Sequence, residues 1–445
     1  MIEGKTTLIR LPNFHLYDEL QQPPLGILYL AAYLEQYDHP VDICDLAGIT
    51  PDRWLSMLPQ DSEIYGITAT SPDYPFALQL LGMIRQDLPG RKVIIGGAHA
   101  SVLPEQCVQD GFDAAVFGEG EDTLRDYVRS RGDRAKSIAG LCYRTDAGPI
   151  RNRPRTLKMH IDEFPFPARH LLPESHVVAH DLVTDNVSAT VITTSRGCPY
   201  KCSFCSQEIW SGHWRLRSAE NIAAELRTIR EQYGVREVRF VDDMVGAKRL
   251  HREIICDAMS RLNLTWRCHL RVDLAGEDML EAFHKAGCIE VSFGVESGDG
   301  DVLRHNRKGW SSPQMALDVV AAAKQVGLRV RAYFIVGLPG ETQMSVENTK
   351  RIIGALRADN VNIFSFIPYP GCDVWANPGR YDYALTDPDL KHFWMLGDGH
   401  SFVGRTSGMS IDDLEKAYRE CRELAANCGK MTWEAKQRMD GVSIQ

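Results

Sequence analysis

Short apolar runs alternate with longer amphipathic segments over the first 135 residues of the chain. The runs read TTLIR, VDICD, EIYGITAT, KVIIGG and FDAAVFGEG. Segments between them, such as LGILYLAAYLEQYD, repeat apolar residues at the spacing of a helix. Strands that alternate with helices form a parallel sheet covered by those helices. The pattern therefore predicts an α/β fold that begins with a doubly wound, Rossmann-like domain over residues 1–135.

The segments that follow three of these apolar runs are rich in small and hydroxyl residues. They read TATSPDY, GGAHAS and GEGED. Ligands of doubly wound domains bind at the carboxyl ends of the strands, where glycine lets the backbone approach a ligand closely. We expect a ligand site there, and the alternative is a domain that only packs.

Residues 136–186 interrupt the alternation. Fragments such as DAGPIRNRPRTL and IDEFPFPARHLLPES are dense in proline and arginine. This composition is typical of a segment that runs over the surface between domains. We predict a linker.

The alternation resumes with six further strand-helix units over residues 187–372. In the first predicted helix, Ser218 is a suitable N-cap and Gly234 a suitable end. Six units are too few to close an eight-stranded barrel, so the pattern predicts a partial (β/α)6 barrel with its chemistry at the carboxyl ends of the strands. Residues 373–445 are predicted to form a helical C-terminal region, with helical patterns over 411–429 and 432–439.

Composition narrows the functional classes. The formal charge of -9, from 50 basic and 59 acidic residues, argues against nucleic acid as the main partner and favours a small-molecule substrate. The sequence contains neither a run long and apolar enough to cross a membrane nor a secretory signal. We therefore expect a cytoplasmic protein without membrane partners, whose 12 cysteines stay reduced.

Three of those cysteines stand together in TTSRGCPYKCSFCSQ, residues 193–207. Cys198, Cys202 and Cys205 follow the first predicted barrel strand and can converge on one metal centre. Structural zinc sites use four ligands, usually as two separated pairs, and the sequence has no partner pair at the expected spacing. A four-iron cluster held by three cysteines leaves one iron open. A zinc knuckle or a chance group of free thiols is the alternative.

The segment GCPYKCSFC resembles the signature of the radical S-adenosylmethionine (SAM) superfamily. The resemblance implies that the open iron binds SAM, and that an electron from the cluster splits SAM into methionine and a 5'-deoxyadenosyl radical. It also implies a partner that donates the electron, such as flavodoxin, ferredoxin or a partner reductase.

Other segments resemble parts of that family which line the SAM site, namely FVDD, RVD, FGVES and FIVGLPGET. Acidic residues at strand ends also cap helices, which is the structural alternative for them. The resemblance implies that Phe204 packs near the adenine, that Asp242 and Asp243 face the top of the barrel, that Arg271 pairs with the SAM carboxylate, that Glu296 accepts from the amine or ribose, and that Gly337 and Pro339 shape the adenine wall.

The N-terminal half resembles the cobalamin-binding domain of one large subclass of this family, through PPLGILYLAAYLE, GGAHAS and GEGEDTL. The sequence lacks the Asp-x-His-x-x-Gly element whose histidine binds cobalt, and its nearest fragment is DLAG at Asp45. Some members of the subclass bind cobalamin without that histidine and others have lost the cofactor, so cobalamin binding is left open.

Two reactions are considered for an enzyme that forms this radical. We favour a lyase that dehydrates a sugar or aminoglycoside, similar to the radical diol dehydratases of antibiotic biosynthesis, because related methyltransferases often carry a longer C-terminal domain. A cobalamin-dependent C-methyltransferase is the alternative, ahead of an RNA-modifying methylthiotransferase and a cobalamin or redox sensor.

Dehydration requires a base and a hydrogen donor near the barrel mouth. The candidate catalytic residues are Glu208, His213, Tyr333 and Tyr369, although core packing explains such aromatic residues equally well. A second cluster on Cys268, Cys288 and Cys372 is a weaker hypothesis, because these cysteines lie far apart in the sequence.

Overall fold

The computed structural model describes residues 4–13, 19–20, 22–181, 187–206, 208–210, 212–393 and 402–430. The chain divides into two compact units, which are described separately below. The first contains residues 1–191, 207–217 and 231–235, and the second contains residues 192–206, 218–230 and 236–445. Among the described residues, none of the helices is both long and apolar enough to span a membrane.

The first unit is built on a seven-stranded sheet with the order β2-β1-β3-β4-β5-β6-β7. Its strands are β1 (Thr6–Arg10), β2 (Val41–Asp45), β3 (Ile64–Thr68), β4 (Lys92–Gly96), β5 (Ala114–Val116), β6 (Leu141–Thr145) and β7 (Gly148–Arg151). The strands β1 to β5 pair in parallel. The chain reverses its direction across the sheet between β1 and β3, which is the position where doubly wound sheets bind ligands.

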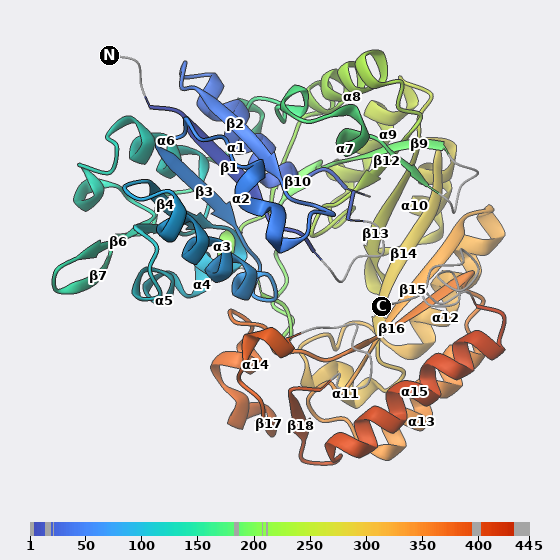
Figure 1. Ribbon diagram of the computed structural model, residues 1–445. Helices are drawn as coiled ribbons and strands as arrows, with labels where there is room; N and C mark the ends of the chain where they lie inside the picture. Colours follow the sequence, from blue (N-terminus) through green and yellow to red (C-terminus); the bar gives the residue numbers. More distant parts are fainter. Residues whose placement is uncertain are drawn as a thin grey trace. The chain divides into compact units, whose positions relative to one another are not determined.

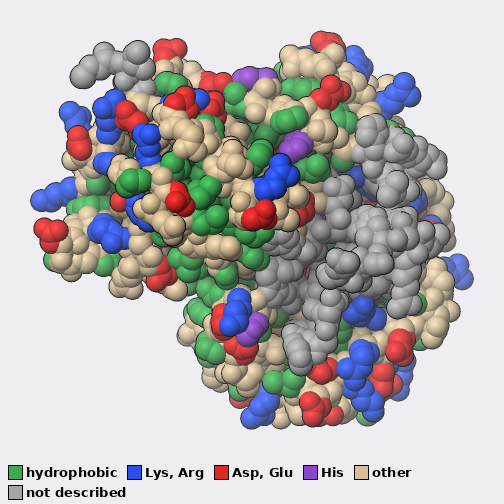
Figure 2. All heavy atoms as spheres, viewed as in Figure 1, with side chains coloured by type: hydrophobic (Ala, Val, Ile, Leu, Met, Phe, Trp, Pro, Cys, Tyr) green, Lys and Arg blue, Asp and Glu red, His purple; other side chains and the backbone are tan. Residues whose placement is uncertain are grey.

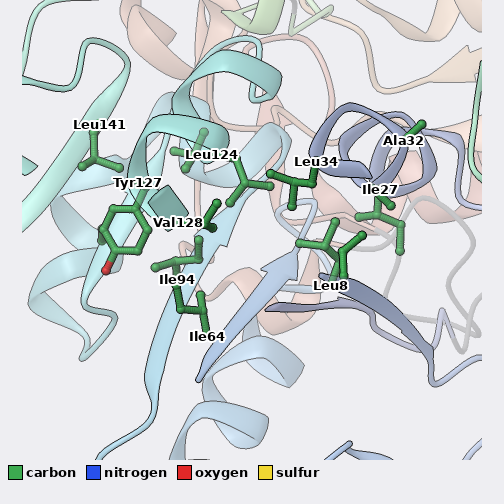
Figure 3. Packing of buried hydrophobic residues seen from close by; sticks show 14 of the residues in the cluster. Leu8, Ile27, Ala32, Leu34, Ile64, Ile94, Leu124, Tyr127, Val128 and Leu141 are labelled. Atoms are coloured by element: carbon green, nitrogen blue, oxygen red, sulfur yellow. The ribbon is translucent and has the colours of Figure 1, made fainter. Parts of the chain in front are cut away.

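Helices cover both faces of this sheet. They are α1 (Leu25–Glu35), α2 (Trp54–Met57), α3 (Tyr74–Asp87), α4 (Ala98–Val102), α5 (Pro104–Gln109), α6 (Glu121–Arg129) and the short α7 (Glu174–Val177). Figure 3 shows the core beneath α1 and α6, where Ile27 and Leu124 pack near Leu8 and Ile94 of the strands. The predicted doubly wound domain is confirmed.

Part of the stretch predicted as a linker belongs to the sheet. The strands β6 and β7 form an antiparallel hairpin, and β6 pairs with β5 in antiparallel fashion. Leu141 and Cys142 are fully buried in this hairpin, where they extend the core of the first unit. The prediction overlooked them because the surrounding prolines and arginines dominate the composition.

The second sheet has the order β16-β15-β14-β13-β12-β9-β8. Its strands are β8 (Ala179–Asp181), β9 (Val187–Ile192), β12 (Glu237–Phe240), β13 (Thr265–Arg271), β14 (Cys288–Glu296), β15 (Arg329–Val336) and β16 (Asn360–Ser365). The strands β12 to β16 are parallel to their neighbours, and β8 is antiparallel to β9. Two very short strands, β10 (Ser195–Arg196) and β11 (Arg215–Leu216), lie outside it. The predicted partial barrel is confirmed.

Helices pack against one face of the second sheet (Figure 1). They are α8 (Ala219–Tyr233), α9 (Arg249–Ser260), α10 (Glu277–Lys285), α11 (Gly300–His305), α12 (Pro313–Val326) and α13 (Gln343–Ala355). Trp266 anchors this layer, because its ring lies 4.9 Å from the rings of both Phe240 and Phe283. The predicted cap of α8 is confirmed, since Ser218 Oγ accepts a hydrogen bond from Asn221 N at 3.1 Å.

The chain after the barrel forms α14 (Asp373–Ala376), a hairpin of β17 (Tyr383–Leu385) and β18 (Gly404–Thr406), and α15 (Ile411–Asn427). The helix α15 matches the first predicted C-terminal helix, and the second, over 432–439, lies outside the described residues. Acidic and basic side chains lie interspersed on the molecular surface (Figure 2). On α15, Lys416 Nζ lies 3.9 Å from Glu420 Oε1. Such exposed pairs contribute little to stability.

Candidate functional site

The cysteine loop follows β9 in the second unit. Cys198 is buried, Cys202 is half-buried and Cys205 is exposed. A tight turn brings the last two together, because Cys205 N donates to Cys202 O at 3.2 Å. The loop thus presents three thiols from buried to exposed within eight residues.

Asn306 fastens this loop to the barrel. Ser203 donates to Asn306 twice, from its backbone N to Asn306 O at 3.2 Å and from Oγ to Oδ1 at 2.8 Å. Asn306 Nδ2 in turn donates to Pro339 O at 2.8 Å. Because Asn306 and Ser203 are fully buried, these bonds fix the cysteine loop against the loop after β15. The sequence analysis missed Asn306, which follows α11 and has no motif of its own.

Arg271 lies beside the cysteine loop at the end of β13. Its Nη1 is 3.8 Å from Cys202 Sγ, its Nε donates to Asp273 Oδ1 at 3.0 Å, and its guanidinium lies 3.9 Å from the centre of the Tyr200 ring. The guanidinium therefore lies beside one of the three cysteine sulfurs of the loop. The predicted pairing of Arg271 with the SAM carboxylate stays a prediction.

Asp242 holds the chain that leads into the cysteine loop. Its carboxylate accepts hydrogen bonds from Thr194 N at 2.9 Å, from Thr194 Oγ1 at 2.8 Å and from Ser195 Oγ at 2.5 Å. His251 also bonds to Thr194. Its Nδ1 accepts a hydrogen bond from Gly246 N at 3.2 Å, so the proton is on Nε2, which donates to Thr194 Oγ1 at 2.8 Å. Asp242 therefore serves as a positioning residue for the loop.

Burial raises the pKa of Asp242 to about 6, although hydrogen bonds from Ser195 and Thr194 oppose the shift. A carboxyl whose pKa is higher in the folded state stabilises the fold when protonated. The protonated carboxyl contributes about 3 kcal/mol to the free energy of unfolding. This contribution is complete below about pH 4 and is lost as the pH rises through 6.

We therefore expect Asp242→Asn to remove the part of the pH dependence of stability that comes from protonation of Asp242. As the pH rises from 4 to 6.5, the melting temperature of the wild-type apoprotein should fall more than that of Asp242→Asn, as measured by calorimetry. Asp243→Asn is the matched control, because Asp243 is the exposed neighbour. Parallel melting curves for the wild type and Asp242→Asn would show that Asp242 is ionised throughout.

Glu296 forms an ion pair with Lys308. Lys308 Nζ donates to Glu296 Oε1 at 2.6 Å and to Gly294 O at 2.8 Å, and both side chains are largely buried. The backbone of Glu296 has a φ of 68°, a left-handed conformation that is uncommon for glutamate. Its predicted contact with the amine or ribose of SAM would have to compete with Lys308.

The loop after β15 contains Gly337 and Pro339, the predicted adenine wall. Gly337 has a φ of 91°, and a Cβ there would lie 2.8 Å from the ring of Phe402. Its backbone N donates to Glu341, whose pKa burial raises to about 8. Phe204 packs against the same apolar cluster as Leu338. The loop is rigid and tightly packed, which suits a wall for a planar base.

Three of the four predicted catalytic residues can be placed by their own surroundings. Tyr333 lies on β15, where its ring centre is 5.8 Å from those of His269 and Phe364. Tyr369 donates to Phe393 O at 3.2 Å within a separate apolar cluster. His213 is exposed and belongs to the first unit. The side chain of Glu208 lies outside the described residues.

The three cysteines of the loop match the number of protein ligands that a four-iron cluster with one open iron requires. In such a cluster each thiolate binds a different iron.

The loops at the carboxyl ends of β3, β4 and β5 are tied together in the first unit. His99 N donates to Ala69 O at 3.2 Å, the His99 ring bonds to Ser71 Oγ at 3.1 Å, and Gly118 N donates to Ser101 Oγ at 3.1 Å. His99 is fully buried, and burial lowers its pKa to about 4. It therefore stays neutral and structural.

Gly97 makes room at this edge of the sheet. Its φ is 92°, and a Cβ would lie 2.8 Å from both Ala69 O and Thr68 Oγ1. Only glycine allows the two loops to approach so closely. The bare backbone and hydroxyl groups here fit a large neutral ligand with many amides, such as cobalamin. Asp45 of the DLAG fragment pairs instead with Arg10 at 3.3 Å and His176 at 2.9 Å.

Two protein-family descriptions match the chain. The radical SAM superfamily matches residues 192–353, which include the cysteine loop, and the B12 binding domain matches residues 18–128. These matches confirm the predicted cluster and SAM, and they add cobalamin, which the sequence analysis had left open.

Two of the similar proteins are methyltransferases by name. "Uncharacterized methyltransferase PH0819" of Pyrococcus horikoshii is 34% identical over 395 residues, which cover 83% of this chain and 84% of the relative. "Cytidylyl-2-hydroxyethylphosphonate methyltransferase" of Streptomyces wedmorensis is 24% identical over 475 residues, which cover 93% of this chain and 89% of the relative.

Among solved structures, the radical SAM methyltransferase TsrM from Kitasatospora setae, with cobalamin and a [4Fe-4S] cluster bound, has a TM-score of 0.72 to this chain. The match covers 96% of this chain and 89% of TsrM at 17% identity. This likeness supports the fold.

The prediction of a dehydrating lyase is therefore wrong. It rested on the short C-terminal region, but the Pyrococcus relative is a named methyltransferase of which this chain covers 84%. Compactness does not separate the two reactions.

Proposed function

This chain belongs to the radical SAM superfamily, in the branch that carries a B12 binding domain, and from this premise we propose that it is a cobalamin-dependent methyltransferase of a small organic substrate. The observation that carries the proposal is the presence of both domains in one chain that is 34% identical to a named methyltransferase. The hydrogen-bonded loops at the strand ends of both units support it.

Each unit contributes a different function in this proposal. When bound, the cluster and SAM supply a hydrogen-abstracting radical, and cobalamin supplies the methyl group. Cys198, Cys202 and Cys205 hold the cluster, and Arg271 lies beside Cys202. Asp242 holds the loop in place through Thr194 and Ser195.

Several predicted roles remain part of the proposal. Phe204, Gly337 and Pro339 form the apolar wall for the adenine. Arg271 binds the SAM carboxylate in place of Asp273. In the first unit, Gly97 and the loops after β3 and β5 hold the corrin. An acidic one-electron donor protein such as flavodoxin or ferredoxin supplies the electrons.

The test uses SAM that carries a CD3 methyl group. The reconstituted protein is incubated anaerobically with reductant, hydroxocobalamin and extracts of small metabolites, and the products are compared by mass spectrometry. We expect a product heavier by one CD3-derived methyl group, formed only when cobalamin is present. A product that has lost water, or a labelled product formed equally without cobalamin, would refute the proposal.

A further inference from the structure

A histidine and an aspartate pair at the carboxyl edge of the first sheet. His176 Nδ1 lies 2.9 Å from Asp45 Oδ2, although the two residues are 131 positions apart in the sequence. Asp45 is the last residue of β2, and His176 belongs to the short helix α7. The pair therefore brings an imidazole from a distant segment to the end of one strand of the sheet.

The carboxylate of Asp45 is fixed by two further donors. Its Oδ1 accepts a hydrogen bond from Ala47 N at 3.0 Å, and its Oδ2 accepts one from Arg10 Nη1 at 3.3 Å. The side chain of Asp45 is only 3% exposed. A buried carboxylate that pairs with a guanidinium is ionised, and an ionised carboxylate can only accept hydrogen bonds.

The bond to Asp45 determines which nitrogen of His176 is available to a ligand. Because the carboxylate only accepts, Nδ1 carries the proton of the bond, and the lone pair of the neutral ring is on Nε2. The side chain of His176 is 20% exposed. Its Nε2 is not fully buried and has no hydrogen-bond partner in the part of the chain that the structure describes.

This arrangement is typical of a histidine that binds a metal. Such a histidine donates its other ring N–H to a carboxylate or a carbonyl, which fixes the orientation of the ring and makes the ligating nitrogen more basic. His176 and Asp45 have the same relation, with Nε2 left for the metal. The structural alternative is that the bond only ties α7 to the sheet, in which case Nε2 has no role.

The strand register places the pair at the edge of the sheet where the corrin is proposed to bind. Asp45, Arg10, Thr68 and Gly96 form one row across β2, β1, β3 and β4. Neighbouring strands lie about 4.8 Å apart, so the two ends of this row are separated by roughly 14 Å. Gly97 follows the row directly. A corrin above the junction of β1 and β3 would lie between Gly97 and His176.

Three other histidines of the first unit are less well placed. His39 bonds to Thr6 Oγ1 at 2.9 Å, at the amino edge of the sheet where β1 begins. His99 lies at the carboxyl edge but is fully buried. His170 bonds to Glu35 at 3.0 Å, and Glu35 ends α1, which leads back to the amino edge. Of these four histidines, His176 alone combines the carboxyl edge with an accessible ring.

We infer that His176 Nε2 is an axial ligand of cobalt in the bound cobalamin, and that Asp45 is the positioning residue that orients the ring. The inference rests on the proposed function, which assigns cobalamin to the first unit. The DLAG fragment lacks a histidine of its own, so in this chain a segment 131 positions away supplies one to Asp45 of that fragment.

Electron paramagnetic resonance tests the inference without turnover. The full-length protein is reconstituted with its cluster and hydroxocobalamin, desalted, and reduced mildly, so that cobalt becomes Co(II) while the cluster stays diamagnetic. One axial nitrogen of natural isotope splits each cobalt line into a triplet. We expect these triplets to become doublets when the histidines of the protein carry nitrogen-15, because the cofactor's own base keeps its natural nitrogen.

Substitutions then identify the histidine. His176→Gln should lose the splitting from histidine. Asp45→Asn should lower the affinity for the corrin by roughly tenfold, the usual effect of removing the outer partner of a metal-binding histidine, and should weaken the splitting. His170→Gln is the matched control, because His170 also pairs with a carboxylate but lies away from the carboxyl edge. It should keep the doublets and the corrin.

Three results would overturn the inference. Triplets that persist with nitrogen-15 histidine would show that the cofactor's own base binds cobalt, and a spectrum without nitrogen splitting would show that no nitrogen does; both come from the wild type and need no variant to fold. Doublets that persist in His176→Gln would assign the bond to another histidine. In each case the protein retains corrin, so the proposed function stands. A wild type that retains no corrin would refute the proposed function and this inference together.

Discussion

Replacing Cys202 with alanine should abolish SAM cleavage. The variant keeps only two cysteines of the loop, and a four-iron cluster bound through two thiolates is not held stably. It also removes the sulfur that lies 3.8 Å from Arg271 and leaves that buried guanidinium with Asp273 and the Tyr200 ring. Iron and sulfide analysis of the reconstituted protein, together with an assay of 5'-deoxyadenosine, measures both losses.

Cys256→Ala is the matched control, because Cys256 is a half-buried thiol on α9, away from the loop. It should retain full iron content and full cleavage. Normal iron content in Cys202→Ala would mean that the cluster has other ligands.

Replacing Gly97 with valine should prevent the first unit from retaining cobalamin. The new side chain would start 2.8 Å from Ala69 O and Thr68 Oγ1, and it would also strain a residue whose φ is 92°. The loops after β3 and β4 would have to separate, and the edge of the sheet would lose the shape that receives the corrin. We expect corrin absorbance after desalting to fall by roughly tenfold or more, the effect of losing a few well-placed contacts.

Gly90→Val provides the control for backbone strain. Gly90 has a φ of 81° but no atom within 4 Å of its added Cβ. It precedes the amino end of β4, whereas Gly97 follows the carboxyl end. Corrin retention should be normal in this variant, and the cluster should be unaffected in both. Equal losses in the two variants would indicate general destabilisation.

The strands and the cysteine loop could be predicted because their signals are local. Apolar runs such as TTLIR and VDICD form β1 and β2, and three cysteines within eight residues can be recognised without any partner. The N-cap of α8 also depends on one residue, Ser218. Such features need only short stretches of chain.

The supports of the site could not be predicted, because they join residues distant in sequence. Asn306 bonds to Ser203, 103 positions away, and Lys308 pairs with Glu296 only because a tight turn returns the chain. Asp242 illustrates a different limit. Its position at a strand end could be read from the sequence, but its hydrogen bonds to Thr194 and Ser195 could not.

The reaction type was predicted wrongly for a related reason. Glu208 and His213 were considered for dehydration because they follow the cysteines in sequence, and Tyr333 and Tyr369 because they were expected on late strands. In the structure, His213 is assigned to the first unit and Tyr369 bonds to Phe393 O. Polar residues near a radical site do not distinguish loss of water from methyl transfer. The relatives do distinguish them, because the relative that is 34% identical is named a methyltransferase.

The most direct test of the central claim is the visible spectrum of the anaerobically reconstituted protein after incubation with hydroxocobalamin and desalting. The account predicts stoichiometric corrin absorbance in addition to the absorbance of the iron-sulfur cluster, because the first unit binds cobalamin and the second binds the cluster. A protein that emerges with cluster absorbance and full SAM cleavage but without corrin would contradict it.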